Sequence, residues 1–181
     1  MLPAVVAIAT VALLSGCVPQ EPVITPEPEP SSTPVFASDE EALAAATDAY
    51  AKYLEVSDQI AHDGGAGADR IENLVTEDWY PNELEQYRLL AGTGQHQVGS
   101  SAFENATLQR RDVSEAHHQI VVFYACLDLS GTRLVDQGGH DVTPEDVDLR
   151  SPFEITMNGL SEDSSELLLA GMERWSGSGV C

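Results

Sequence analysis

Two hydrophobic periodicities divide the chain and set the fold class that it can adopt. Between Leu43 and Ile60, apolar side chains recur every three or four residues, which predicts an amphipathic helix. Between His118 and Leu127 the period falls to two, which predicts a strand. Both alternating sets of that strand are largely apolar, so we expect it to be covered on both faces, in the middle of a sheet.

Residues typical of helix ends lie on both sides of the apolar stripe between Leu43 and Ile60. Ser38 and Glu41 have the spacing of a capping box, so the helix should begin near Ser38, and Gly64-Gly65 should end it. We predict a short helix at 70–75 and a third at 82–91, which stops at Gly92-Thr93-Gly94. Further strands are predicted at 132–136, 150–157 and 166–175. Helices followed by hairpin-connected strands indicate an α+β fold with an antiparallel sheet.

The segment before the predicted domain is rich in proline and glutamate. Residues 18–34 contain six prolines, which remove amide donors and favour extended backbone. Such a run acts as a spacer of about 3.1 Å per residue, or roughly 50 Å in all. We therefore predict a disordered spacer over 17–37 and a single α+β domain over 38–181.

We predict a signal peptide over 1–16, which has no charged side chain; its apolar run at 2–14 is too short to span a bilayer. The predicted peptide ends in Leu14-Ser15-Gly16 before Cys17, a run that resembles the lipobox of bacterial lipoproteins. The resemblance implies cleavage before Cys17, a lipid (palmitate) on that cysteine, and attachment to the extracytoplasmic face of the cell membrane. Signal peptides normally open with basic residues, so we hypothesise that translation starts upstream of Met1.

Several stretches of the domain resemble uncharacterised secreted lipoproteins of high-GC Gram-positive bacteria: Glu40-Glu41-Ala42-Leu43 with Tyr50 and Tyr53, Ile60 with Asp63-Gly64-Gly65, 124–131, and Trp175-Ser176-Gly177 with Cys181. The order of elements also resembles the nuclear-transport-factor-two-like (SnoaL-like, cystatin-like) cone fold. That fold implies N-terminal helices followed by a curved antiparallel sheet. It hosts enzymes and non-catalytic binding modules alike.

Cys126 and Cys181 remain once Cys17 is lipidated, an even pair in an exported protein. We predict that they form a disulfide that holds the glycine-rich C-terminal tail across the sheet. The alternative is two separate thiols, with Cys126 as a small core residue. A disulfide disfavours nucleophilic or metal chemistry at Cys126.

The candidate catalytic pair is Asp58 and His62, one helical turn apart and hence on one helix face. The cone-fold enzymes that the chain resembles use acid and base groups inside a cavity. In this chain Tyr50, Trp79 and Tyr124 would line that cavity, and Asp128 would add a carboxylate. Against this, both residues lie off the apolar stripe, which favours a solvated helix end. His117 and His118 point to opposite faces of a strand and cannot chelate one ion together.

The remaining polar clusters carry weaker signals. Gly138-Gly139-His140-Asp141 and Glu145-Asp146 form an acidic loop without the ordered carboxylates of a calcium loop, so we predict an ordinary hairpin loop and no metal or cofactor. The formal net charge of −22 disfavours nucleic acid as a partner. We expect a non-catalytic envelope domain that binds an unknown protein or small molecule. The alternative is an isomerase, dehydratase or cyclase.

Overall fold

The computed structural model describes residues 35–114, 118–161 and 163–181. These residues form one compact unit. The predicted signal peptide, Cys17 and most of the predicted spacer lie outside the described residues, so the cleavage and lipid site predicted there stay predictions. Phe36, which was assigned to the spacer, is only 2% exposed and belongs to the core, so the packed part of the chain begins before Ser38.

The long first helix, α1, spans Asp39–His62. Its N-cap is Ser38, whose Oγ accepts a hydrogen bond from the Glu41 amide at 3.1 Å. Glu41 reaches back as predicted, but to the amide of Ala37, one residue before the cap, at 2.7 Å. Gly65 closes the helix with a left-handed φ of 87° and its amide donates to the Ile60 carbonyl.

Two shorter helices follow: the 3₁₀ helix η1 at Ala68–Leu74 and α2 at Tyr80–Thr93. Gly65 also permits the close approach of α2 to the end of α1, since a Cβ at this position would lie 2.2 Å from the Tyr87 carbonyl oxygen. The segment between η1 and α2 is tied to the edge of the sheet, where the Thr76 amide donates to the Leu169 carbonyl at 2.9 Å. All three predicted helices are therefore present, with small shifts of their ends.

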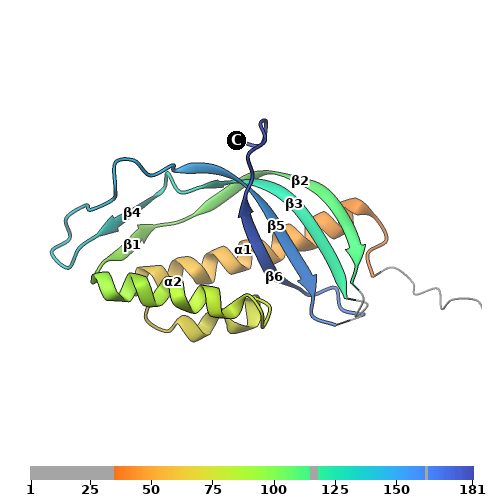
Figure 1. The fold of residues 1–181 in the computed structure, drawn as a ribbon, viewed down its shortest axis with the longest axis horizontal. Helices are drawn as coiled ribbons and strands as arrows, with labels where there is room; N and C mark the ends of the chain where they lie inside the picture. The colour runs from red at the N-terminus through yellow and green to blue at the C-terminus, as the bar shows by residue number, and fades with distance from the viewer. Residues whose placement is uncertain (1–34, 115–117, 162) are drawn as a thin grey trace, which may run out of the picture. The chain divides into compact units, whose positions relative to one another are not determined.

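The main sheet has four antiparallel strands in the order β2-β3-β5-β6, and they curve across α1 (Figure 1). Their bounds are β2 Ala102–Val113, β3 Gln119–Asp128, β5 Arg150–Gly159 and β6 Leu167–Arg174. A second sheet pairs β1 His96–Gly99 with β4 Thr132–Val135. Strand β3 lies between β2 and β5, as the two apolar sets of the strand predict. The predicted α+β class, with helices before a curved antiparallel sheet, is confirmed.

Strands β1 and β2 were not predicted from the sequence. β2 is an edge strand, and most of its side chains are exposed or half-buried, so its hydrophobic alternation is faint. Two register shifts against β3, between Glu104 and Thr107 and between Leu108 and Arg110, further interrupt the pattern. A polar edge strand of this kind leaves little periodicity to detect.

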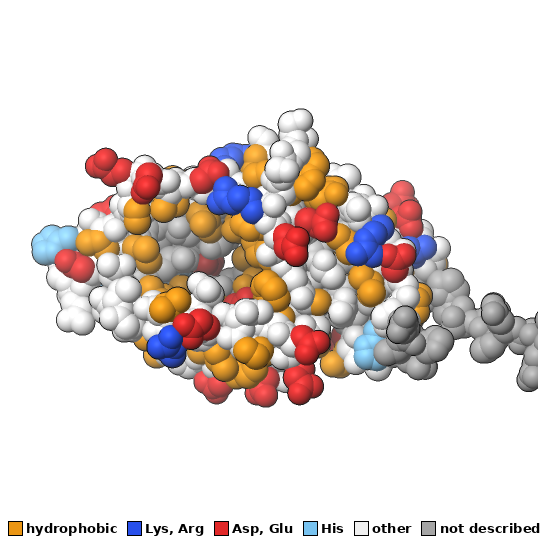
Figure 2. All heavy atoms as spheres, in the orientation of Figure 1, with side chains coloured by type: hydrophobic (Ala, Val, Ile, Leu, Met, Phe, Trp, Pro, Cys, Tyr) orange, Lys and Arg blue, Asp and Glu red, His pale blue; other side chains and the backbone are white. Residues whose placement is uncertain are grey.

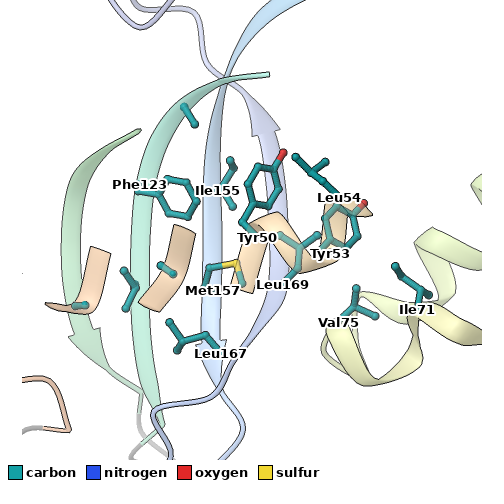
Figure 3. Close-up of a cluster of buried hydrophobic side chains, with 14 of the residues drawn as sticks. Tyr50, Tyr53, Leu54, Ile71, Val75, Phe123, Ile155, Met157, Leu167 and Leu169 are labelled. Carbon is teal, nitrogen blue, oxygen red and sulfur yellow. The ribbon is translucent and has the colours of Figure 1, made fainter. Parts of the chain in front are cut away.

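The core fills the space between α1 and the concave face of the sheet. Figure 3 shows Tyr50 and Tyr53 of α1 among side chains of β3, β5 and β6, with Ile71 and Val75 beside them. Tyr50 is fully buried and its ring makes edge-to-face contacts with Phe103 and Phe123, at centroid distances of 5.0 and 5.9 Å. The interior of the cone is therefore packed with aromatic and aliphatic side chains.

The C-terminal tail crosses the opposite face of the sheet. Trp175 stacks on Tyr124 with ring centroids 4.5 Å apart, and Asn105 Nδ2 donates to the Val180 carbonyl at 2.9 Å. The structure shows a Cys126–Cys181 disulfide, with sulfur atoms 2.07 Å apart. Cys126 alternates with Ala125, which belongs to the core, so the bond lies on the face away from α1. The tail is thus held at three points on β2 and β3.

Candidate functional site

A groove of about 480 Å³ runs beside the C-terminal half of α1, and we call it the α1 groove. One side is formed by α1 and the other by the bend that joins β1 to β2. Its apolar lining is Ala51, Leu54, Ala102 and Phe103. Its polar lining is Glu55, Asp58, Gln59, His62, Ser100 and Ser101. The volume lies within the range of small-molecule pockets.

Asp58 lines this groove and is buried, only 7% exposed. Its Oδ1 accepts from Gln97 Nε2 and from Ser101 Oγ, both at 2.7 Å, and its Oδ2 accepts from the Ser101 amide at 2.8 Å. The expectation of a solvated position was wrong for this residue. The β1–β2 bend folds over the end of α1, and helical periodicity carries no information about that tertiary contact.

His62 lines the same groove, so the structure brings the predicted pair to one surface. Its Nε2 lies 2.5 Å from the carbonyl oxygen of Gly99. In the part of the chain that the structure describes, no hydrogen bond or ion pair joins His62 to Asp58. Each residue instead contacts a different part of the β1–β2 bend, and the arrangement differs from an acid–base dyad.

The other residues predicted to line a catalytic cavity are dispersed. Tyr50 is packed in the core, and its hydroxyl lies 3.8 Å from Met172 Sδ. Tyr124 lies on the outer face of the sheet against Trp175, and Asp128 ends β3, where its Oδ1 accepts from the Ser130 amide at 2.8 Å. The expectation that these residues share a cavity was wrong, because the core fills the interior where that cavity would lie.

Trp79 belongs to a polar cluster between α1 and α2 that the sequence analysis missed. The Oε1 of Glu83 accepts from Trp79 Nε1 at 2.9 Å and from the Tyr53 hydroxyl at 3.0 Å. Burial raises the pKa of Glu83, and the hydrogen bonds from its aromatic neighbours lower it in part. Burial also raises the pKa of the hydroxyls of Tyr53 and Tyr87, which therefore remain donors at neutral pH. The four-residue spacing of Trp79, Glu83 and Tyr87 is a signal that could have identified the cluster.

The acidic loop after β4 is organised by its own side chains. Asp136 Oδ1 accepts from the Gly138 and His140 amides at 2.8 and 2.9 Å, and Asp136 Oδ2 lies 3.1 Å from His140 Nδ1. Among the described residues, no group of three or more His, Cys, Asp or Glu side chains is placed to hold a metal ion. His117 lies outside the described residues, and the amide of His118 donates to Ser114 Oγ at 3.0 Å.

The arginines of the chain are locally neutralised. Each of the seven forms an ion pair with a carboxylate: Arg70 with Asp63, Arg88 with Glu85, Arg110 with Asp112, Arg111 with Asp39, Arg133 with Asp141, Arg150 with Glu104 and Asp128, and Arg174 with Asp148. Figure 2 shows basic side chains next to acidic ones and further acidic side chains elsewhere on that face. Neither lysine nor arginine lines the α1 groove.

No helix in the described ranges has the length and hydropathy needed to cross a membrane. No family model matches the chain, and no curated protein matches it. Among solved structures, it is similar to the intermembrane space region of the chloroplast protein ARC6, with 9% identity, a TM-score of 0.53, and coverage of 75% of this chain and 97% of the other. At this identity the likeness shows the fold alone.

Two further solved structures are similar at lower scores. A periplasmic fragment of TraM has 17% identity and a TM-score of 0.49, with coverage of 77% of this chain and 98% of the fragment. Aln2 from a Streptomyces species has 16% identity and a TM-score of 0.40, with coverage of 77% of this chain and 93% of the other.

Proposed function

We propose that this chain is a lipoprotein anchored through Cys17 on the extracytoplasmic face of a cell membrane, and that its α+β domain binds a small molecule in the α1 groove without catalysis. One observation carries the proposal. The interior of the cone is packed, whereas Asp58, Glu55 and His62 face an open groove with an apolar floor. This groove combines an apolar surface with a few convergent polar groups, as ligand sites do.

The disulfide supports an extracytoplasmic location, because disulfides persist in oxidising compartments and are rare in the cytosol. The lipobox-like run that ends at Cys17 supports the lipid anchor. The same proposal assigns the chain to secreted lipoproteins that have a nuclear-transport-factor-two-like domain, on the basis of the resemblance described above.

The hydrogen bonds that Asp58 accepts favour binding over catalysis. A general base must be free to accept a proton from the substrate. Asp58 already accepts three hydrogen bonds from the β1–β2 segment, and these bonds hold the bend in place. A carboxylate used in this way supports the architecture of the groove.

The second candidate is an enzyme of the isomerase, dehydratase or cyclase type that uses Asp58 and His62. The observation in its favour is that both side chains line one groove. The two candidates differ in the fate of a bound molecule. A ligand recovered unchanged after prolonged incubation, with binding retained in His62→Gln, supports the binding module. Conversion that His62→Gln abolishes would establish the enzyme.

The anchor is tested by growing expressing cells with radiolabelled palmitate. We expect the wild-type chain to incorporate the label and sediment with membranes, and Cys17→Ser to remain unlabelled. An unlabelled wild-type chain would contradict the anchor. The groove is tested separately by amide NMR of the full chain against a fragment library, where a hit should perturb 100–103 first.

A further inference from the structure

Two negatively charged side chains, Glu55 and Asp58, line the α1 groove beside its apolar floor. Given the binding function proposed above, on which this inference rests, we infer that the groove selects small monocationic ligands, with an ammonium group on a compact apolar body. The inference depends on the floor, the two carboxylates and the surrounding charge.

The floor is rigid and apolar. The ring of Phe103 lines the groove and packs edge-to-face on the fully buried Tyr50, at a centroid distance of 5.0 Å. Leu54, which is 9% exposed, lines the same groove from α1. A ring held from behind by the core offers apolar contact without a large loss of side-chain freedom on binding.

Asp58 is a fixed acceptor at the polar end of the groove. A carboxylate has about four acceptor positions, and Asp58 uses three of them, two on Oδ1 and one on Oδ2. The hydrogen bonds from Ser101 fix the orientation of the carboxylate. Oδ2 accepts only the bond from the Ser101 amide among the described residues. We assign its second position to the ammonium donor, because a charge-assisted bond of this kind is stronger than a neutral one.

Glu55 lies one turn before Asp58, so the two carboxylates occupy one face of α1. Glu55 is exposed, and no ion pair engages it among the described residues. His62, the remaining titratable group of the groove, contacts the Gly99 carbonyl.

Little positive charge offsets these carboxylates. Every arginine is already paired elsewhere, and Lys52, the one lysine of the chain, lines a different hollow beside β6. The groove itself has two carboxylates and no basic residue other than His62. A cation is attracted to such a surface, and an anion is repelled.

The test compares three probes of one shape: 2-phenylethylamine, 2-phenylethanol and phenylacetate. Each is titrated calorimetrically into the full chain at neutral pH and low ionic strength, where electrostatic selectivity is greatest. We expect the amine to bind about tenfold more tightly than the alcohol, since one charge-assisted bond replaces a neutral one, and phenylacetate to give no saturable signal. Higher salt should reduce the difference between the amine and the alcohol.

Glu55→Gln removes one groove charge from an exposed position and should keep the fold. We expect it to weaken amine binding about fivefold, the effect of one charge at short range in water, and to leave the alcohol unchanged. Glu72→Gln on η1, exposed and outside the groove, is the matched control and should change neither affinity.

The possible failures are distinguishable. Equal affinities for the amine and the alcohol would overturn the cation selectivity while leaving the groove as a binding site. Equal losses in Glu55→Gln and Glu72→Gln would overturn it too, because general surface charge would then account for the preference. Absence of saturable binding by all three probes would overturn both the selectivity and the groove as a small-molecule site.

Discussion

Ser101 donates two hydrogen bonds to Asp58, from its backbone amide to Oδ2 at 2.8 Å and from its hydroxyl to Oδ1 at 2.7 Å. The two residues are 43 positions apart in the sequence. This pairing connects the last turns of α1 to the start of β2, and Gln97 strengthens it from β1. It forms the polar end of the α1 groove and holds the bend between the two sheets over the helix.

Asp58→Ala should therefore lower the free energy of unfolding by about 2–4 kcal/mol, because it leaves donors of Ser101 and Gln97 without an acceptor. Ser101→Ala keeps the backbone donor and should cost only about 1 kcal/mol. Chemical denaturation measures both. Glu40→Ala, at an exposed position of α1, is the control, and equal losses in Asp58→Ala and Glu40→Ala would contradict the assigned role.

Removal of the disulfide should destabilise the domain, because the unfolded chain then gains conformational entropy. The bond joins residues 55 positions apart, and the chain-entropy relation gives about 4 kcal/mol for a loop of this length. The double variant Cys126→Ala/Cys181→Ala should show this loss in denaturant titrations. A reducing agent should lower the melting temperature of the wild-type chain and leave the double variant unchanged; an equal response of the two would refute the stabilising role.

Asn105 should stabilise the folded domain in two ways, through its backbone conformation and through its side chain. Its φ of 56° is left-handed, at the bulge in β2, and its amide holds the Val180 carbonyl. Asn105→Gly keeps the backbone conformation and loses the hydrogen bond, so it should cost about 1 kcal/mol. Asn105→Ala adds backbone strain, for a total of about 2–3 kcal/mol. If alanine proved as stable as glycine in thermal melts, strain at this position would be ruled out.

Glu83 should make stability fall as the pH rises. Burial raises its pKa in the folded state above its ordinary value of 4.5, so the folded chain binds the proton more tightly than the unfolded chain. Its contribution is most favourable below pH 4.5 and declines as the pH rises through the higher folded pKa. Glu83→Gln retains an acceptor for Trp79 and Tyr53 but does not titrate.

The measurement is the free energy of unfolding of wild type and Glu83→Gln between about pH 4 and about pH 8, because a raised pKa places the pH dependence above the ordinary value of 4.5. As the pH rises, the free energy of unfolding of Glu83→Gln should increase relative to that of wild type. Glu72→Gln, exposed on η1, should run parallel to wild type over the same range. A constant difference between Glu83→Gln and wild type would show that Glu83 titrates alike in both states.

The sequence predicts the elements that have strong local signals. The cap at Ser38, the stripe on α1 and the two apolar sets of β3 each depend on neighbours along the chain, and the structure has all three. The pairing of Cys126 with Cys181 was predicted by setting Cys17 aside as the lipid site, which left an even pair, and the structure has that disulfide. β2 was missed because an edge strand with one solvated face has little apolar alternation.

The site could be predicted only in part. Asp58 and His62 were identified from their spacing, and both line the α1 groove. Their environment was not predictable, because their partners Ser101 and Gly99 lie far along the chain and reach them only through the fold of β1 and β2. The same limit applies to Glu83: its spacing to Trp79 is visible in the sequence, but its burial depends on α2 packing against α1.

The position of a bound ligand distinguishes the α1 groove from every other surface of the domain. We would titrate 2-phenylethylamine into the isotopically labelled full chain and follow the backbone amides by NMR. We expect saturable shifts confined to 100–103 and to the α1 residues from Ala51 to His62. Shifts that rise linearly without saturation, or that fall on another part of the domain, would contradict the groove as the binding site.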